Sequence, residues 1–385
     1  MTEIKENRED GTMKITGMEP YVLRWPEPND ADHDRMTVLL RVDTDAGVSG
    51  WGEAIAMWPE ACAATTAIIT DGLAPLLAGA DTRDTTACWQ MMKAHTWWYG
   101  EGGIATLALS AIDMALWDIA AKDAGKPLYA FLGGAVHPTL PACASLHVNH
   151  PTIGDSVAAI AGYIDEGFRS AKLGLGKRGA SRAGRDPEYD VALVEALREA
   201  IGPEPDIMVD AGNGTRWDLE TAIGTTRRME AFDIKWMEEP LHPSDIAGHQ
   251  AFKAGVRILV AAGEREWGLA GYQRWIDSGA VDVFGIDPAR AEGITGFRQI
   301  AAAVEDAGRI VNAHAWSTAV LTAASLHLSV ATRAAILFEL KPIPGPMQFE
   351  LVDEPIWHED GLIAAPDRPG HGAEPRPTVL ERYRI

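Results

Sequence analysis

Short apolar runs alternate with amphipathic segments along the chain after Pro141. Segments between the runs have helical periodicity, as in EYDVALVEALREAIG, where Leu193, Val194, Leu197 and Ile201 share one face. The apolar runs are ACASLHV, RSAKLGL, DIMVDAG, IKWMEEP, RILVAAGE, VDVFGID, RIVNAHA and AAILFEL. Eight strand-then-helix units predict an α/β fold, a (β/α) TIM-type barrel of parallel strands inside a ring of helices.

The first third of the chain has a different pattern, which mixes strand and helix. Residues 36–54, MTVLLRVDTDAGVSGWGEA, predict a hairpin with its polar turn at Asp43–Gly47. Helical patterns follow at about 60–78, 84–98 and 103–124, and the last of them stops at Gly125. We therefore expect a disordered leader at 1–12, an α+β domain at 13–137, the barrel at 138–345 and a C-terminal segment at 346–385.

A charged or titratable residue recurs where each apolar run of the barrel ends. These residues are His147, Lys172, Asp210, Glu238, Glu264, Asp287, His314 and Glu339. They recur every 23 to 28 residues, except for one gap of 38 that contains the inserted stretch GKRGASRAGR. Because the carboxyl ends of barrel strands converge at one mouth, where active sites form, the pattern predicts a site built from these side chains.

Three of these residues, Asp210, Glu238 and Glu264, are carboxylates that end consecutive strands. Held together, they would repel one another unless a cation lay between them. Ligation by oxygen alone favours Mg²⁺, or Mn²⁺, over zinc. The alternative is a network of salt bridges with Arg265 or Lys235. Glu239 follows Glu238 directly, so we expect its side chain to turn away from the ion or to support its ligands.

The remaining strand ends suggest proton transfer and carboxylate binding. Asp287 beside His314 would fix the imidazole tautomer and raise its pKa, giving a base; the alternative is a structural histidine. Lys172 is a candidate to bind a substrate carboxylate, or else a charge partner of Asp210. Glu339 could hydrogen-bond the same carboxylate or form a buried pair with Lys172 or Lys341. His147 and Asn213 are further candidates for substrate contact.

Composition narrows the range of partners. The net charge of −21 and the pI of about 4.9 argue against nucleic acid and anionic membranes, which both require a basic surface. Asp113 and Asp118 interrupt the longest apolar stretch, so we expect no membrane span. Three widely spaced cysteines and a polar N-terminus fit the reducing cytoplasm and no signal peptide.

Over residues 14–385 the chain resembles the mandelate racemase branch of the enolase superfamily. The motifs that carry the resemblance are GVSGWGEA, ALSAIDMALWDIAAKDAGKPLYAFLGG, FRSAKL, MVDAGN, WMEEPL, AAGE, GIDPARAEGITG, NAHAW and DGLIAAPDRPGHG. The resemblance implies that the α+β domain caps a modified barrel and that the C-terminal segment returns to it. It also implies homo-oligomers, Mg²⁺ on Asp210, Glu238 and Glu264, a His314–Asp287 dyad, and Glu339 near a substrate carboxylate.

Two departures from the family pattern bear on the reaction. The family's Lys-x-Lys motif reads Lys172-Leu173-Gly174 here, so Gly174 stands in place of a second lysine base. The motif Asp-x-Asn is one residue longer, which moves Asn213. Racemisation requires bases on two faces, whereas one histidine can remove an α-proton and return it to a departing β-hydroxyl. We therefore expect a dehydratase that converts an acid sugar to a 2-keto-3-deoxy product.

Other functions remain open at this stage. A racemase, epimerase or cycloisomerase would use Lys177 or Lys172 as its second base, and a non-catalytic binder of sugar acids would use neither. The basic loop 176–185, which contains Lys177, is either a lid that attracts anionic substrate or a solvated loop. We expect capping-domain loops near Arg24–His33 and Glu53–Trp58 to add specificity, with His33 and Trp58 as candidate contacts.

Overall fold

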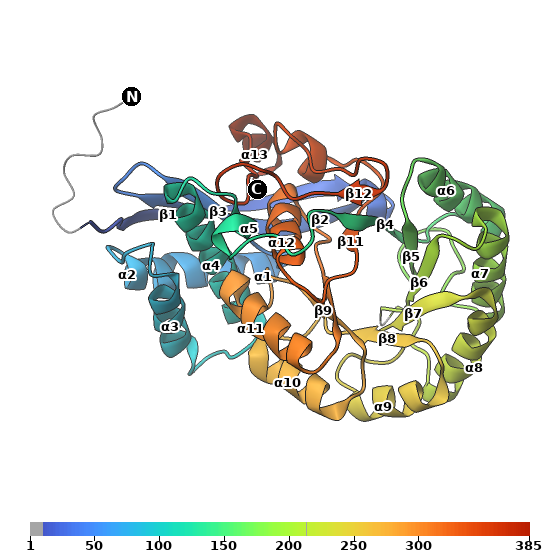
Figure 1. Ribbon diagram of the computed structural model, residues 1–385. Coiled ribbons are helices and arrows are strands. Elements are labelled where there is room, and N and C mark those ends of the chain that lie inside the picture. The colour runs from blue at the N-terminus through green and yellow to red at the C-terminus, as the bar shows by residue number, and fades with distance from the viewer. Residues whose placement is uncertain (1–10, 213) are drawn as a thin grey trace.

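The N-terminal unit is an antiparallel sheet covered by helices (Figure 1). The computed structural model describes residues 11–212 and 214–385, so most of the predicted leader at 1–12 lies outside the described residues. The sheet has the order β1 (Ile15–Glu27), β2 (His33–Thr44), β3 (Ser49–Ala54). The predicted hairpin is confirmed, because β2 and β3 pair from Val38–Ala54 to Asp43–Ser49.

Helices follow where the periodicity predicted them. The first, expected at 60–78, is interrupted by a π-helical turn at Ile68–Leu73. The helices of this unit are α1 (Pro59–Ala67), α2 (Ala74–Leu77), α3 (Thr85–Thr96), α4 (Gly103–Asp123) and α5 (Leu128–Phe131). Helix α4 is the one described helix long and apolar enough to cross a membrane, but 89% of its most apolar window is buried inside the protein. Its acids have partners there: Asp113 accepts hydrogen bonds from Thr295, and Asp118 from the Trp51 and His371 amides.

Helix α4 packs directly against strand β3, and two glycines make this possible. A Cβ atom on Gly52 would lie 1.9 Å from the Ala111 carbonyl oxygen, and one on Gly50 would lie 2.3 Å from that of Ala115. Both distances are far below van der Waals contact, and both obstacles are backbone atoms of a buried helix. The glycines of GVSGWGEA therefore set the distance between sheet and helix.

Replacing Gly52 with alanine is expected to destabilise the protein by about 3 kcal/mol, since overpacking a rigid core usually costs 1–3 kcal/mol. Denaturant unfolding followed by circular dichroism measures this loss. Gly17→Ala is the matched control, because Gly17 also lies in a strand of this sheet but a Cβ there would meet nothing within 4 Å. Equal stability of the two variants would contradict the packing argument.

The second unit is a barrel of parallel strands, which confirms the predicted fold class. Adjacent strands are hydrogen-bonded in the order β10-β9-β8-β7-β6-β5-β4-β11, and the Val311 amide of β10 bonds to the Ala334 carbonyl before β11, which nearly closes the ring. The strands are β4 (Leu140–His147), β5 (Ser170–Gly174), β6 (Asp206–Asp210), β7 (Ile234–Glu238), β8 (Leu259–Ala262), β9 (Val283–Ile286), β10 (Ile310–Ala313) and β11 (Phe338–Leu340).

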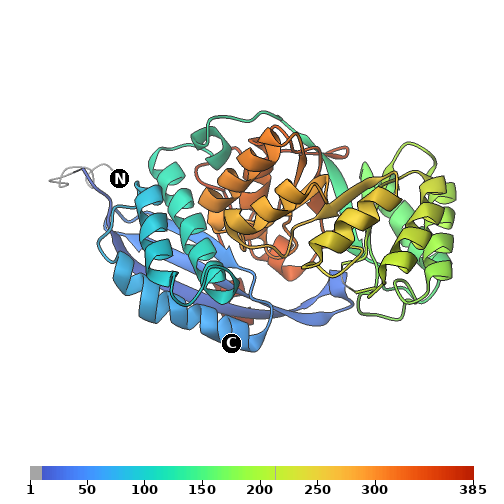
Figure 2. The same cartoon turned by 90° about the horizontal axis from the view of Figure 1, so that it is seen from below.

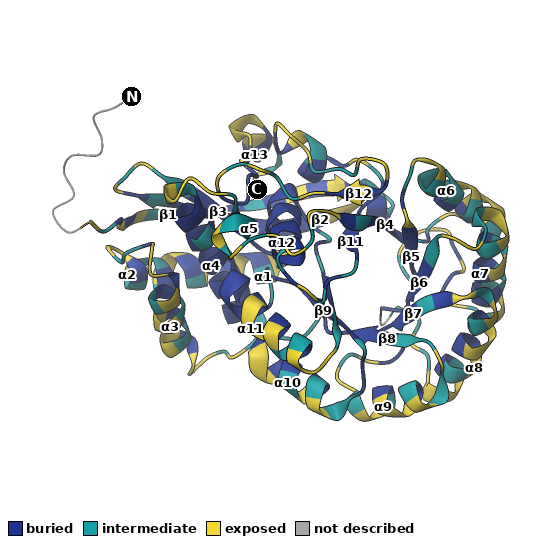
Figure 3. Cartoon of the chain, viewed as in Figure 1, coloured by how far each residue is buried: buried dark blue, intermediate teal, exposed yellow. Residues whose placement is uncertain are grey.

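Helices surround these strands; most of them turn a polar face outward, whereas α12 is buried along its whole length between the barrel and the first unit, as the burial pattern in Figure 3 shows. They are α6 (Ile153–Asp165), α7 (Pro187–Ile201), α8 (Leu219–Met229), α9 (Ile246–Gly255), α10 (Gly268–Ser278), α11 (Gly293–Asp306) and α12 (Ala319–Val330). The barrel interior is filled by its own side chains, including Cys143, Met208, Trp236 and Val283. The barrel is thus a packed core with its functional groups confined to one end.

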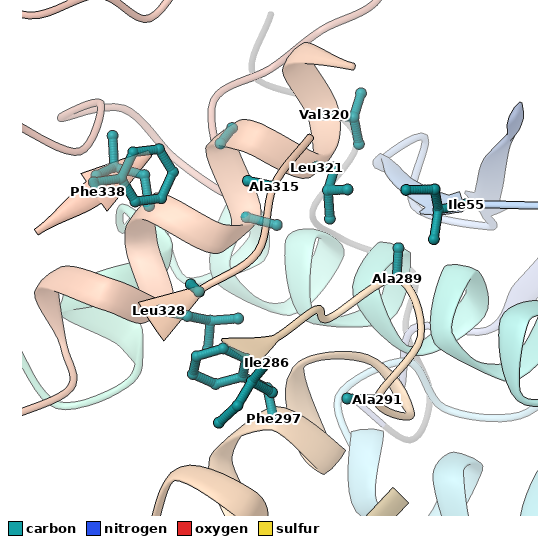
Figure 4. Close-up of a cluster of buried hydrophobic side chains, with 14 of the residues drawn as sticks. Ile55, Ile286, Ala289, Ala291, Phe297, Ala315, Val320, Leu321, Leu328 and Phe338 are labelled. Atoms are coloured by element: carbon teal, nitrogen blue, oxygen red, sulfur yellow. The ribbon is translucent and has the colours of Figure 1, made fainter. Parts of the chain in front are cut away.

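Apolar and polar contacts join the two units. Ile55, which follows β3, faces Val320 and Leu321 of α12 (Figure 4). The neighbouring Glu53 is fully buried and accepts hydrogen bonds from Ser317 and Thr318 at the start of α12. The first unit is therefore fixed on the barrel close to the end of β10.

Two segments from the end of the chain also reach the first sheet. After β11, the Ile343 backbone forms two hydrogen bonds with the Asn29 side chain, and Lys341 forms a buried ion pair with Glu27. The last helix, α13 (Pro377–Tyr383), lies beside β1, and the Ile385 amide bonds to the Val22 carbonyl (Figure 1). From below, the β1–β2 ribbon extends toward the green barrel strands (Figure 2). This brings the β1–β2 turn near the barrel mouth.

Candidate active site

A cavity of about 780 Å³ lies where the capping sheet meets the mouth of the barrel. Five of the predicted strand-end residues line it: His147, Lys172, Asp210, Glu264 and His314. The capping unit adds Asp30 from the β1–β2 turn, Arg35 from the start of β2, and Met57 and Trp58 from the loop after β3. The periodic strand ends thus meet at one site, as the parallel barrel requires.

The three carboxylates predicted to bind metal come from adjacent strands. Asp210 and Glu238 are register partners at the ends of β6 and β7, and Glu264 follows the end of β8. Their side chains do not form a preassembled cluster: among the described residues, no three His, Cys, Asp or Glu groups have metal-binding spacing. Each carboxylate instead contacts a cation. Lys177 lies 3.2 Å from Asp210, Lys172 2.9 Å from Glu238, and His314 Nε2 3.3 Å from Glu264.

The chemistry of these residues nevertheless fits a hard divalent cation. The donors are all carboxylate oxygens, the ligands that Mg²⁺ prefers. Asp210 Oδ1 is buried and has no hydrogen-bond partner among the described residues. Burial raises the pKa of Glu238 to about 8, although the positive charge of Lys172 lowers it. The negative charges of Asp210, Glu339 and Glu264 raise this pKa further. A bound cation would relieve this repulsion, so Asp210, Glu238 and Glu264 are the residues that would hold Mg²⁺.

His314 and Asp287 form the predicted dyad. Nδ1 of His314 lies 2.7 Å from Oδ2 of Asp287, which is completely buried and also accepts the Ala289 amide. Burial lowers the pKa of His314, but Glu264 and Asp287 outweigh it and raise it to about 9. Asp287 therefore fixes Nδ1 as a proton donor, and Nε2 faces the cavity between the dyad and Glu264.

Lys172 lies between the carboxylates of Glu238 and Glu339. Its Nζ is 2.9 Å from Glu238 and 2.8 Å from Glu339, whose other oxygen accepts from Asn312. Burial disfavours the charge, yet the two acids raise the pKa of Lys172 well above its ordinary value. The alternative that Lys172 pairs with Asp210 is wrong, because Lys177 takes that place. Of the two partners considered for Glu339, Lys172 is the one found, since Lys341 pairs with Glu27.

Glu239, the second acid of WMEEPL, lies beside the site and forms an ion pair with Arg265. Its backbone has a φ of +42°, and Arg265 Nε donates to its carboxylate at 2.6 Å. Arg265 also lies 3.3 Å from Glu264. Burial and the charge of Glu264 raise the pKa of Glu239 to about 7. Arg265 thus links Glu239 to a predicted metal ligand, in agreement with the expectation that Glu239 turns away from the ion.

The predicted substrate contacts divide into three groups. His147, Lys177 and Trp58 line the cavity. His33 is exposed, and its ring contacts the Asp30 carbonyl oxygen; it is not among the lining residues. Asn213 lies outside the described residues.

Among the lining residues that the sequence analysis did not name individually are Asp30, Arg35 and Trp316, although Asp30 lies within the predicted capping loop Arg24–His33. Arg35 pairs with Asp30 at 3.1 Å and stacks over Trp316 at 4.6 Å. Asp30 and Arg35 come from the capping sheet, where no strand-end period marks them. Trp316 follows His314 by two residues, so its place in NAHAW was the one available signal.

Comparison with known proteins agrees with this architecture. Residues 29–133 match the mandelate racemase / muconate lactonizing enzyme, N-terminal domain, and residues 155–379 match the enolase C-terminal domain-like family. D-galactarolactone cycloisomerase of Agrobacterium fabrum is 29% identical, over 97% of this chain and 99% of its own. D-galactonate dehydratase of Pectobacterium atrosepticum is also 29% identical, over 97% and 95%.

A solved structure supports the same assignment. The crystal structure of a racemase from Streptomyces coelicolor A3(2) with bound magnesium has a TM-score of 0.86 and 27% identity, over 96% of this chain and all of that one. The two family matches cover both units of the fold and all the strand ends from Lys172 onward. The chain therefore belongs to the enolase superfamily, in its mandelate racemase branch.

Proposed function

We propose that the protein is a Mg²⁺-dependent dehydratase, a hydro-lyase that removes water from an acid sugar to give a 2-keto-3-deoxy product. One observation carries the proposal: His314, held by Asp287 from behind, lines the same cavity as Asp210 and Glu264, and Glu238 lies beside Asp210 at the adjacent strand end. A base beside a cation site is what removal of a proton α to a carboxylate requires.

Each residue of the site has its own role in the proposed reaction. When bound by Asp210, Glu238 and Glu264, Mg²⁺ supplies positive charge to the substrate carboxylate as negative charge grows on it. Lys172 lines the cavity from β5 and would bind that carboxylate, and Glu339 of β11 holds Lys172 in place at 2.8 Å. His314 takes the α-proton at Nε2 in its neutral form, which is favoured once a cation offsets the charge of Glu264, the largest influence that raises the pKa of His314. Asp287 keeps Nδ1 protonated and stabilises the imidazolium. Exclusion of water by the capping loops would strengthen each of these charges.

A cycloisomerase or epimerase is the second candidate, and Lys177 is the observation that favours it. A Cβ atom on Gly174 would lie 3.0 Å from Cε of Lys177, so the loop lysine fills the space beside the missing family lysine. The named relatives include both activities. A binder without catalysis would have no need for a buried dyad, which argues against that third possibility.

Screening the purified protein with Mg²⁺ against a library of mono- and diacid sugars tests the proposal. We expect a 2-keto product from at least one compound, detected as its semicarbazone, and loss of that product with EDTA. The same reactions in D₂O separate the two candidates. Exchange or inversion at Cα with no compound of the library losing water would contradict dehydration and favour an epimerase, whereas a ring-opened or ring-closed isomer formed without a keto group would indicate a cycloisomerase.

A further inference from the structure

His147 is held in one orientation at the end of β4. Its Nδ1 lies 3.0 Å from Oδ1 of Asp30, which belongs to the capping unit. Its ring stacks on Trp316 with a centroid distance of 4.3 Å and an angle of 16°. Trp316 is fixed in turn, because its Nε1 donates to the Ser145 carbonyl and Arg35 stacks over its ring. A hydrogen bond and a stacked ring together leave the imidazole little freedom to rotate.

The other ring nitrogen of His147 is available to a ligand. His147 lines the cavity, and its Nε2 has no hydrogen-bond partner among the described residues. A histidine whose Nδ1 is held by a carboxylate and whose Nε2 faces a cavity has the arrangement of a general base. The His314–Asp287 pair in the same cavity has this arrangement too.

The place of His147 in the sheet relates it to the missing family lysine. His147 is the register partner of Gly174, and a Cβ atom at Gly174 would lie 3.1 Å from Cδ2 of His147. The imidazole therefore occupies space next to the position from which a lysine at 174 would extend. His147 and His314 come from β4 and β10, on the two sides of β11.

We propose that His147, oriented by Asp30, is a second base of this site, which exchanges the α-proton of the acid-sugar epimer whose Cα–H bond points toward β4. The inference rests on the proposed function, because it uses the same cavity and the same class of substrate. Asp30 is a positioning residue, since it acts through the imidazole.

The surroundings of His147 keep it ready to accept a proton. Burial lowers the pKa of His147, Asp30 raises it, and the nearby Lys177 and Arg35 lower it further. The net direction is downward, so the ring is neutral near pH 7 with its proton on Nδ1, toward Asp30. The lone pair is then on Nε2, the ring nitrogen that is not held by Asp30.

The exchange step balances without any other reactant. The Cα–H bond breaks, the proton moves to Nε2 of His147, and the electron pair enters the enediolate of the substrate carboxylate. The imidazolium exchanges that proton with solvent and returns one to Cα from the same side. No oxidation occurs and no group is lost, so the product is the same epimer carrying solvent hydrogen.

Proton exchange in a His314→Asn background tests the proposal. Each acid sugar of the screening library is compared with its C2 epimer, for example D-galactonate with D-talonate. Both compounds are incubated in D₂O with Mg²⁺, and deuterium at C2 of each is followed by NMR. We expect His314→Asn to incorporate deuterium into one epimer of a pair without loss of water. The His147→Asn/His314→Asn double variant should be slower by at least about tenfold.

The matched control is His137→Asn in the same background. His137 lies before β4, where its ring contacts the Arg333 carbonyl, and it does not line the cavity. Equal exchange rates with and without His147, or absence of exchange in His314→Asn, would overturn the inference while the proposed function stands. A wild-type protein that neither dehydrates nor exchanges any library member overturns both.

Asp30→Asn tests the positioning role, because asparagine keeps a hydrogen-bond acceptor and removes the charge. Without the carboxylate the pKa of His147 falls, so the rise of the exchange rate with pH should move to lower pH and the plateau rate should drop. A purely structural role of Asp30 would lower the rate without moving this profile. An unmoved profile therefore excludes the proposed role.

Discussion

His314→Asn is expected to lower kcat for dehydration by about three to four orders of magnitude. Asparagine is similar in size and can still hydrogen-bond to Asp287, but it cannot accept the α-proton. Its neighbours stay in place, because Asp287 keeps its second bond from the Ala289 amide at 2.8 Å. Mg²⁺ affinity, measured by calorimetry, should change little, since His314 is not among the three proposed ligands.

The control for this variant is His249→Asn. His249 is a buried histidine whose Nδ1 contacts the carbonyl of Asp245, the residue just before helix α9, and it lines no part of the cavity. Its replacement should affect stability more than turnover per folded molecule. Retention of a tenth or more of wild-type kcat in His314→Asn would exclude His314 as the base for dehydration.

Glu238→Gln is expected to weaken Mg²⁺ binding by at least about 100-fold, beyond the 10- to 100-fold typical of residues that only support a ligand. Turnover at fixed Mg²⁺ should fall accordingly and recover in part at high Mg²⁺. Glu238 is the central member of the proposed ligand set, because β7 lies between β6 and β8. Calorimetric titration with Mg²⁺ and kinetics over a range of Mg²⁺ concentrations measure both effects.

The stability of Glu238→Gln distinguishes loss of metal from loss of fold. The folded-state pKa of Glu238, about 8, lies above the ordinary value of a glutamate, so near pH 7 the unfolded chain loses this proton more readily than the metal-free folded protein, which costs stability. The cost is absent well below the unfolded pKa and grows as the pH rises through the window between the two values. A neutral glutamine avoids it, and Lys172 keeps Glu339 as a partner. The metal-free variant should therefore unfold at a temperature no lower than the wild type at pH 7, with Glu188→Gln as an exposed control.

Periodicity revealed most of the fold and the ends of the strands. The positions of Asp210, Glu238 and His314 follow from the sequence, because each ends an apolar run and a parallel barrel gathers such ends in one place. The hairpin at 36–54 was equally visible, since its apolar alternation is interrupted by a single polar turn. These features depend on local pattern and on one topological rule.

Contacts between side chains of different strands were harder to predict. Lys172 pairs with Glu238 and Glu339 rather than with Asp210, and this choice depends on strand register and side-chain length, which spacing does not specify. Asp30 was invisible for a different reason. It lies in a turn of the capping sheet, 117 residues before the histidine that it holds, and a single sequence carries no signal for such a contact.

The pairing of Asn29 with Ile343 bears on how the enzyme is made. These partners are 314 positions apart. During synthesis, the turn that carries Asp30 therefore cannot form its hydrogen bonds to Ile343 until nearly the whole polypeptide has left the ribosome. A nascent chain that stops before β11 can form the hairpin, but it lacks Lys341 and Ile343 to fasten the edge of the cavity. The edge of the cavity can therefore be completed only late in synthesis, after β11 and the residues that follow it are available.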